Sequence, residues 1–427
     1  MTMTMSTALL TDHYELTMLQ AALRSGAAHR RAVFEVFARH LPGGRRYGVV
    51  AGTGRVLDSL DSFRFRPDEL EFLATAVDAQ TLEFLADYRF SGHVYGYREG
   101  DVYFPASPIM VVEGTFAEAV LLETMILSIL NHDCAIASAA SRMTTAAAGR
   151  PIIEMGSRRT HEWAAVAAAR AAYIAGFSST SNLMAGRLYG VPTAGTAAHA
   201  FTLLHDSEQA AFEAQVATLG AATTLLVDTY DVPQAVRTAV EVAGTKLGAV
   251  RIDSGDLAVA AQEVRAQLDS LGAFSTRILV TSDLDEYAIA ALAAAPVDGY
   301  GVGTSVVTGS GVPTAALVYK LVARETAAGT LEPVAKRSVG KPSRGGRKEA
   351  YRLLDDAGRY ETEYVTVSGT APAGGVPLLH PLVRDGEVIG AEPLEAARAR
   401  HREAIALLPQ EALHLGRGYA AIPTEFA

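Results

Sequence analysis

Side chains able to bind anions, hold a metal ion or move protons occur in groups between residues 155 and 304, each directly after a short apolar run. The groups combine arginine, aspartate, one histidine and small residues: Arg158 and Arg159, Thr196 and His199, Asp228, Arg251 and Asp253, Ser282 and Asp283, and Gly303 and Thr304. Guanidinium groups bind phosphate or carboxylate through paired hydrogen bonds, and glycine turns cradle phosphate with backbone N–H groups. Carboxylates beside a diphosphate hold Mg²⁺. These residue types predict a Mg²⁺-dependent enzyme that acts on a phosphorylated anion.

Any one of these positions also has an ordinary structural explanation, because Asp or Ser after a strand often caps the next helix. A solitary histidine such as His199 is more often structural than catalytic, although it can serve as a base, a metal ligand or a nucleophile. The recurrence of polar groups at the same end of six runs favours function. In a parallel barrel the C-terminal strand ends surround a common mouth. We therefore expect the six groups to line one cavity.

The elements that would position these residues alternate along the chain. Short apolar runs predict strands at 151–155, 191–195, 223–228, 248–253, 277–283 and 298–304. Alanine-rich stretches predict helices at 161–175, 207–219, 232–242, 257–271 and 285–294. This strand-then-helix rhythm is typical of parallel strands joined by crossover helices. It predicts an α/β barrel of the TIM type or a close variant.

The flanking segments form a second domain in this interpretation. We assign residues 1–114 to its N-terminal part, 115–324 to the barrel and 325–427 to its C-terminal part. The N-terminal part has a predicted helix at 14–24 and predicted strands at 32–39 and 109–112. The C-terminal part has predicted strands at 351–354, 364–368 and 381–383 and a predicted helix at 394–407. The second domain is therefore expected to be α+β.

Composition and charge exclude several classes of protein. Hydrophobic residues make up 49% and charged residues 20% of 427 residues, which is typical of a globular chain. A net charge of −10 argues against a nucleic-acid-binding surface, so phosphate must be bound by a local cationic cluster. A single cysteine, Cys134, cannot form a disulfide framework. We see no signal peptide in residues 1–7, and the apolar stretch 117–130 is too short to span a bilayer and predicts a core helix. A cytoplasmic location is therefore expected.

Five motifs resemble the nicotinate phosphoribosyltransferase family. In chain order they are Leu10-Thr11-Asp12-His13-Tyr14, Phe34-Glu35-Val36-Phe37-x-Arg39, Gly195-Thr196-Ala197-Ala198-His199, Val250-Arg251-Ile252-Asp253-Ser254-Gly255-Asp256 and Gly301-Val302-Gly303-Thr304-Ser305. No single motif is specific for this family, but the combination of the five motifs in this order is highly specific. The resemblance extends from Leu10 to at least Arg352, which is nearly the whole chain.

The resemblance implies a fold and a reaction. The family has an irregular TIM-like barrel, of the type II phosphoribosyltransferase kind, with a second domain built from both chain ends, and it forms homodimers. Its members join nicotinate to phosphoribosyl pyrophosphate with ATP and Mg²⁺, and so belong to the ATP-dependent ligases. The products are nicotinate mononucleotide and diphosphate, which feed NAD salvage. No nucleic acid or membrane partner is expected.

The resemblance also assigns roles to residues. His199 would be the histidine that ATP phosphorylates, and Asp228 would orient its imidazole. The nicotinate ligands would be Tyr14, donated from the neighbouring subunit to stack on the ring, together with Thr196, Arg251 and Arg158. The phosphoribosyl pyrophosphate ligands would be Asp253, Ser282, Asp283, Gly303 and Thr304. Asp253 is in addition the candidate Mg²⁺ ligand.

A basic segment from Lys336 to Lys348 resembles a further motif of the family. The ordinary interpretation is a solvated loop. Because the protein is acidic overall, a phosphate-rich ligand such as the nucleotide explains the clustering better. Lys336, Lys341 and Lys348 are the candidate ATP or phosphate ligands.

Three alternatives remain open. Nicotinamide phosphoribosyltransferase carries an aromatic residue where this chain has Met155, and an aspartate that binds the amide. Residues 179–182 contain no carboxylate, which favours nicotinate. Quinolinate phosphoribosyltransferase shares the fold type but lacks the Gly-Thr-x-Ala-His motif. A barrel metallohydrolase would use His199, Asp228 and Asp253 as metal ligands, although such enzymes normally need several histidines.

Overall fold

The computed structural model describes residues 6–336, 344–367 and 369–427, and the chain divides into two compact units. Unit 1 consists of Met1–Ser138 and Val312–Ala427, and unit 2 is Ala139–Gly311. Unit 2 is narrower at both ends than the predicted barrel segment 115–324. At one end, β12 (Leu317–Glu325) belongs to unit 1 because it pairs with β1 (Arg31–Ala38), which also pairs with β5 (Met110–Thr115). At the other end, buried residues from Ala117 to Ala135 share one hydrophobic core cluster with β1 residues such as Phe34.

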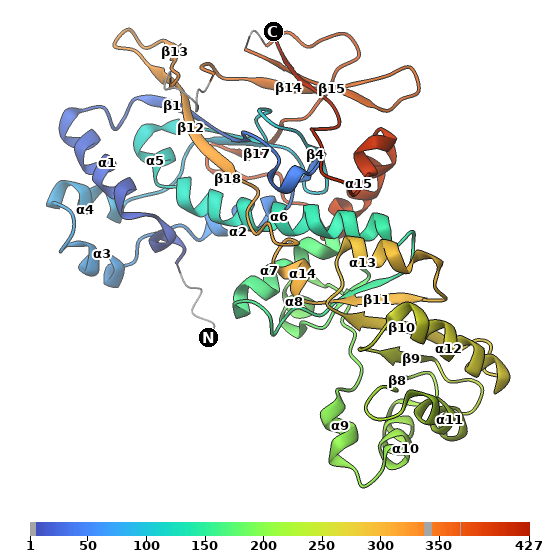
Figure 1. Ribbon diagram of the computed structural model, residues 1–427. Coiled ribbons are helices and arrows are strands. Elements are labelled where there is room, and N and C mark those ends of the chain that lie inside the picture. The colour runs from blue at the N-terminus through green and yellow to red at the C-terminus, as the bar shows by residue number, and fades with distance from the viewer. Residues whose placement is uncertain (1–5, 337–343, 368) are drawn as a thin grey trace. The chain divides into compact units, whose positions relative to one another are not determined.

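Unit 2 is built on a six-stranded parallel sheet with the order β7-β6-β11-β10-β9-β8 (Figure 1). The strands are β6 (Ile152–Glu154), β7 (Ser179–Thr180), β8 (Thr224–Leu226), β9 (Ala249–Ile252), β10 (Arg277–Ser282) and β11 (Gly299–Val302). The helices are α7 (Glu162–Ile174), α8 (Leu183–Tyr189), α9 (His199–Leu204), α10 (Glu208–Leu219), α11 (Val232–Ala243), α12 (Leu257–Ser270), α13 (Glu286–Ala291) and α14 (Thr304–Val307). The predicted strand-then-helix alternation is confirmed.

The parallel sheet curls but does not close. The first strand of the unit, β6, pairs with the last strand, β11, as neighbouring strands of a barrel do. Among the described residues, β7 and β8 do not pair with each other. The predicted strand at 191–195 is wrong: Thr193 forms only one parallel bridge, to Thr180 of β7. The fold is thus a mixed α/β structure with an open, half-barrel sheet.

Helix capping separates ordinary aspartates from candidate site residues. Asp231 caps α11, Asp256 caps α12 and Asp285 caps α13, each by accepting backbone N–H groups of the first turn. A side chain at such a position stabilises a helix by about 1 kcal/mol. Asp228 and Asp253 precede these caps by three residues, and neither caps a helix. The cap residues explain why each strand is followed at once by a helix.

Unit 1 contains two main sheets formed by both ends of the chain. The larger has the order β13-β12-β1-β5-β3-β17-β18 and the smaller β16-β14-β15-β19. The remaining strands are β2 (Gly48–Val49), β3 (His93–Gly96), β4 (Val102–Tyr103), β13 (Leu331–Pro333), β14 (Glu349–Leu354), β15 (Tyr360–Thr366), β16 (Val376–Pro377), β17 (His380–Arg384), β18 (Glu387–Val388) and β19 (Thr424–Phe426). Pairing of β3 with β17 and of β1 with β12 joins the N-terminal and C-terminal segments.

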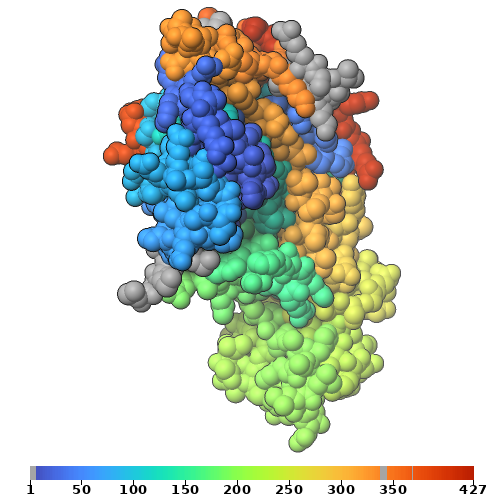
Figure 2. Space-filling view, turned by 90° about the vertical axis from the view of Figure 1, so that its left-hand side faces the viewer, coloured from blue at the N-terminus to red at the C-terminus, as the bar shows by residue number. Residues whose placement is uncertain are grey.

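The helices of unit 1 are α1 (His13–Ser25), α2 (Thr53–Asp61), α3 (Pro67–Leu73), α4 (Ala79–Ala86), α5 (Phe116–Val120) and α15 (Leu394–Leu407). Helix α6 (Glu123–Ala146) begins in unit 1 and ends in unit 2, which starts at Ala139. Figure 2 shows α1, in dark blue, beside α3 and α4, in light blue, on one face of this unit. In α1, Tyr14 is 43% exposed, whereas the neighbouring Glu15 is buried and accepts hydrogen bonds from Thr124 and Thr11. In the part of the chain described, no helix is both long enough and apolar enough to span a lipid bilayer.

Candidate active site

Unit 2 contains a cavity of about 460 Å³ at the C-terminal ends of its strands. Its 17 lining residues are Met155, Ser157, Arg158, Arg159, Ser181, Gly195, Thr196, Ala197, Ala198, Arg251, Asp253, Thr281, Ser282, Asp283, Gly301, Gly303 and Thr304. They come from the segments that follow β6 and β7, from residues 195–198, and from the ends of β9, β10 and β11. Eight predicted site residues therefore share one cavity: Arg158, Thr196, Arg251, Asp253, Ser282, Asp283, Gly303 and Thr304.

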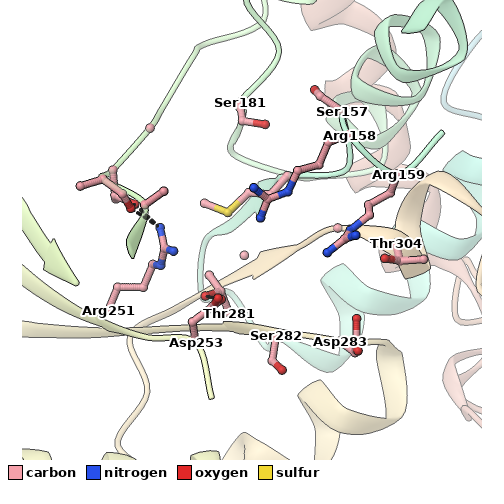
Figure 3. Close-up of a pocket in the computed structure, with 17 residues that line it drawn as sticks. Ser157, Arg158, Arg159, Ser181, Arg251, Asp253, Thr281, Ser282, Asp283 and Thr304 are labelled. Carbon is pink, nitrogen blue, oxygen red and sulfur yellow. Dashed lines mark hydrogen bonds between the residues drawn. The ribbon is translucent and has the colours of Figure 1, made fainter. Parts of the chain in front are cut away.

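The cavity has cationic and acidic sides. Figure 3 shows Arg158 and Arg159 reaching into it from one side, with Asp253, Ser282 and Asp283 on the opposite side. Such a division suits a substrate that carries both phosphate groups and a metal ion, since guanidinium binds the first and carboxylate the second. The arrangement provides local anion binding in an acidic protein.

Arg251 is held at the edge of the cavity by the segment that precedes α9. Its Nη1 atom donates to the Thr196 hydroxyl and to the carbonyl oxygen of Ala197, the latter at 3.2 Å (Figure 3). Burial and the nearby Arg158 lower the pKa of Arg251, while Asp253 and Asp228 raise it. Arginine nevertheless remains charged in proteins. Nη1 is thus anchored, whereas the buried Nε atom of Arg251 has no hydrogen-bond partner among the described residues.

His199 and Asp228 do not line the cavity, but both lie next to its residue Asp253. The imidazole Nδ1 is 3.1 Å from the Thr229 hydroxyl, and Nε2 is 3.9 Å from Asp228 Oδ1 and 4.0 Å from Asp253 Oδ2. The Asp228 side chain is only 2% exposed, and its Oδ2 accepts from the Asp253 backbone N–H and the Ser254 hydroxyl. The histidine side chain is 39% exposed, so a reactant can reach it. An accessible imidazole thus faces two carboxylates.

The acidic side fits Mg²⁺ brought by a diphosphate. The Thr281 hydroxyl donates to Asp253 Oδ1, which fixes the carboxylate, and Asp283 lines the same cavity. Mg²⁺ commonly takes one or two protein carboxylates and completes its shell with substrate oxygens and water. Among the residues described, no three His, Cys, Asp or Glu side chains are placed to hold a metal ion by themselves.

Glu154 was missed by sequence reasoning. This residue of β6 is fully buried beneath the cavity, where its carboxylate accepts from the Gly156 backbone N–H and, at 2.5 Å, from the Thr180 hydroxyl. Burial raises the pKa of Glu154, and these two hydrogen bonds lower it. The only signal was an acidic residue inside an otherwise apolar run. Ser157, Ser181 and Thr281 were also missed, although each adjoins a predicted group.

The remaining predicted residues lie outside this cavity. Tyr14 is in unit 1 at the start of α1. Lys348 is 3% exposed, and its ammonium donates to Glu35 and to the carbonyl oxygens of Arg344 and Gly346. In this structure the Lys348 ammonium forms a buried ion pair with Glu35. Lys336 is exposed in unit 1, and Lys341 lies outside the described residues.

Known proteins resemble this chain over nearly its full length. Residues 9–131 match the family model of the nicotinate phosphoribosyltransferase N-terminal domain. The nicotinate phosphoribosyltransferase pncB1 of Mycobacterium tuberculosis is 58% identical, over 97% of this chain and 94% of that protein. The crystal structure of human nicotinic acid phosphoribosyltransferase superposes with a TM-score of 0.85 at 26% identity, covering 98% and 97% of the two chains. The crystal structure of nicotinate-nucleotide pyrophosphorylase from Pyrococcus furiosus superposes with a TM-score of 0.77 at 25% identity, covering 94% of this chain and 95% of that chain.

Proposed function

Because this chain belongs to the nicotinate phosphoribosyltransferase family, we propose that it transfers the phosphoribosyl group of phosphoribosyl pyrophosphate to nicotinate. The products are nicotinate mononucleotide, an intermediate of NAD salvage, and diphosphate. The observation that carries the proposal is the shared cavity of unit 2, in which eight predicted ligands meet.

The Arg251 side of the cavity takes nicotinate. A guanidinium group and a pyridine carboxylate are both planar, so they form paired, charge-assisted hydrogen bonds. Thr196 holds Arg251 in place and lies beside the same site. Residues 179–182, which include the cavity residue Ser181, contain no carboxylate that would repel an anionic base. The site therefore favours nicotinate over nicotinamide.

The remaining residues of the cavity take the phosphate groups. Arg158 and Arg159 bind the diphosphate, and the turn at Gly303 and Thr304 receives the ribose 5-phosphate through backbone N–H groups and a hydroxyl. Ser282 and Asp283 complete the acidic wall. Asp253 would hold Mg²⁺, which when bound neutralises charge on the departing diphosphate.

The residues of the cavity mainly align the reactants. The pyridine nitrogen of nicotinate attacks C1 of the ribose, the bond from C1 to the diphosphate oxygen breaks, and diphosphate leaves with the electron pair. Holding two reactants in line lowers the barrier because translational and rotational freedom is lost at binding and not in the transition state. Arg158 and Arg159 stabilise the negative charge that develops on the leaving oxygen.

His199 couples the transfer to ATP, which places the protein among the ATP-dependent ligases. Its imidazole takes the γ-phosphoryl group, ADP leaves, and water later releases phosphate. The buried Asp228 carboxylate, 3.9 Å from Nε2, would orient the imidazole. We further propose a cytoplasmic homodimer in which Tyr14 of one subunit stacks on the nicotinate bound by the other. The exposed phenol at the start of α1 supports this role for Tyr14.

A comparison of three bases tests the proposal. The protein is incubated with phosphoribosyl pyrophosphate and Mg²⁺, with or without ATP, and with nicotinate, nicotinamide or quinolinate. Nicotinate mononucleotide should form from nicotinate, and faster with ATP. Preferred use of nicotinamide, or turnover of quinolinate with release of carbon dioxide, would refute it.

A further inference from the structure

Glu154 is a buried acid that the proposed reaction does not use. Its side chain and that of Thr180 are both fully buried, and neither lines the cavity. An ionised carboxylate in such surroundings destabilises the fold unless donors compensate it. Within the described part of the chain two donors reach it, the Gly156 backbone N–H and the Thr180 hydroxyl. Both belong to segments that carry cavity residues.

These hydrogen bonds connect two turns. Gly156 begins the turn with Ser157, Arg158 and Arg159, while Thr180 precedes Ser181, whose backbone N–H donates to the Glu154 carbonyl oxygen at 2.8 Å. The two turns are also joined directly, because the Asn182 amide donates to the Ser157 hydroxyl at 3.0 Å. Strand pairing ends at Glu154 and Thr180. Through its hydrogen bonds to Gly156 and Thr180, the Glu154 carboxylate therefore holds the two turns that follow β6 and β7.

The end of β11 and the turn at Gly303 and Thr304 also contact this region, next to Met155 and Gly156. The backbone N–H of Met155 donates to the Val302 carbonyl at 2.7 Å. A Cβ atom at Gly156 would lie 2.9 Å from the Gly303 carbonyl oxygen and 2.2 Å from a Val307 methyl group. The turn that Glu154 fixes therefore packs closely against the Gly303–Thr304 turn. Small movements at Gly156 would shift both the arginines and the candidate phosphate turn.

We propose that Glu154 is a positioning residue: its buried carboxylate holds Gly156 and Thr180 so that the arginine turn, Ser181 and the Gly303 turn keep one geometry for the diphosphate-bearing substrate. This inference rests on the proposed function. Binding groups need placement within about 0.5 Å to act together, and misplacement by about 1 Å costs up to roughly 100-fold in rate. Glu154 acts through other residues and does not touch the substrate.

Four variants form two matched pairs. Glu154→Leu removes both acceptors, whereas Glu154→Gln keeps a carbonyl acceptor for Gly156 but presents an amide NH2 donor to the Thr180 hydroxyl. Thr180→Val removes the hydroxyl at nearly constant shape, and Thr180→Ser keeps it. We measure kcat and KM for both substrates, the binding of inorganic pyrophosphate by calorimetry, and thermal unfolding.

We expect kcat/KM to be highest in the wild type, lower in Glu154→Gln and lowest in Glu154→Leu, where it should be reduced about 10- to 100-fold. In Thr180→Val kcat/KM should fall several-fold, and in Thr180→Ser it should change very little. Pyrophosphate binding should weaken in the same order. Wild-type kinetics and pyrophosphate binding in folded Glu154→Leu or Thr180→Val would overturn the proposal, as would a change confined to thermal stability.

Two further outcomes are decisive. If Glu154→Leu does not fold, the two Thr180 variants decide. A loss of kcat/KM and of pyrophosphate binding in Thr180→Val that is absent in Thr180→Ser supports the positioning role. Equal kcat/KM and equal pyrophosphate binding in the two variants would overturn it. If wild-type protein forms no nicotinate mononucleotide, the proposed function fails, but the pyrophosphate measurements still compare the variants. The two failures are therefore distinguishable.

Discussion

The Nε2 atom of His199 lies 3.9 Å from Oδ1 of Asp228, and that oxygen is buried and accepts no hydrogen bond from any described residue. The other oxygen of the same carboxylate is held by Asp253 and Ser254. The Asp228 carboxylate is held in place by these two hydrogen bonds, so its Oδ1 atom can accept from the imidazole N–H after a small movement of His199. This geometry is the basis of the ATP-coupling prediction.

Replacing His199 with Ala should abolish ATP hydrolysis and the stimulation of product formation by ATP, because it removes the imidazole that faces Asp228 and Asp253. Uncoupled transfer should remain measurable, since the cavity residues are unchanged. Parallel assays of ADP and nicotinate mononucleotide measure both effects. His205→Ala is the matched control, because this residue follows the same helix and binds the Phe201 carbonyl. Full ATP coupling in His199→Ala would contradict the assignment.

Replacing Arg251 with Lys should raise KM for nicotinate by about 10- to 100-fold, since hydrogen bonds to a charged group contribute about 1.5–3 kcal/mol. A lysine ammonium cannot bind Thr196 and the nicotinate carboxylate through one planar fork. KM for phosphoribosyl pyrophosphate should change much less. Arg237→Lys, on the exposed face of α11, is the control. Equal increases for both substrates would place Arg251 outside the nicotinate site.

A methyl group at Gly156 should be poorly tolerated. The added Cβ atom would lie 2.2 Å from Val307 and 2.9 Å from the Gly303 carbonyl oxygen, so the arginine turn must move. We expect Gly156→Ala to lower the free energy of unfolding by about 1–3 kcal/mol and to reduce kcat/KM. Urea unfolding and steady-state kinetics measure these effects. At Gly416 a Cβ atom meets nothing within 4 Å, so Gly416→Ala should behave like the wild type.

Glu15 should make stability depend on pH. Burial raises its pKa to about 7, from 4.5 in the unfolded chain. The folded state therefore binds the proton more tightly, and this stabilisation is complete below pH 4.5 and lost as the pH rises through about 7. From pH 5 to 8, wild-type stability should fall relative to Glu15→Gln, by on the order of 3 kcal/mol. Urea unfolding at both pH values tests this, with exposed Glu71→Gln as control. Parallel pH profiles would contradict it.

Much of the secondary structure could be predicted because its signals are local. Helix α15 has the predicted bounds 394–407, and α12 begins at the predicted Leu257. The failure at 191–195 has a physical reason: Pro192 has no backbone N–H to donate to a strand ladder. The strand that exists, β7, has only two residues and therefore no detectable alternation.

The candidate site was predictable where its residues follow strands. Parallel strands bring such residues together in any barrel-like fold, and the cavity is lined by residues of five of the six predicted groups. Asp228 and His199 are not among the lining residues. The roles of Glu154 and Lys348 could not be predicted, because they depend on partners supplied by folding. Lys348 meets Glu35, a residue 313 positions away, and so a basic cluster in the sequence becomes a buried ion pair in the structure.

Phosphoryl transfer to the imidazole is the most direct test of the central claim. Wild-type protein and His199→Ala are incubated with ATP labelled at the γ-phosphate and analysed for acid-labile phosphate by mass spectrometry of the intact chain and its peptides. The account predicts one labile phosphate on His199 in the wild type and none in the variant. Label on another residue, or equal label in His199→Ala, would contradict it.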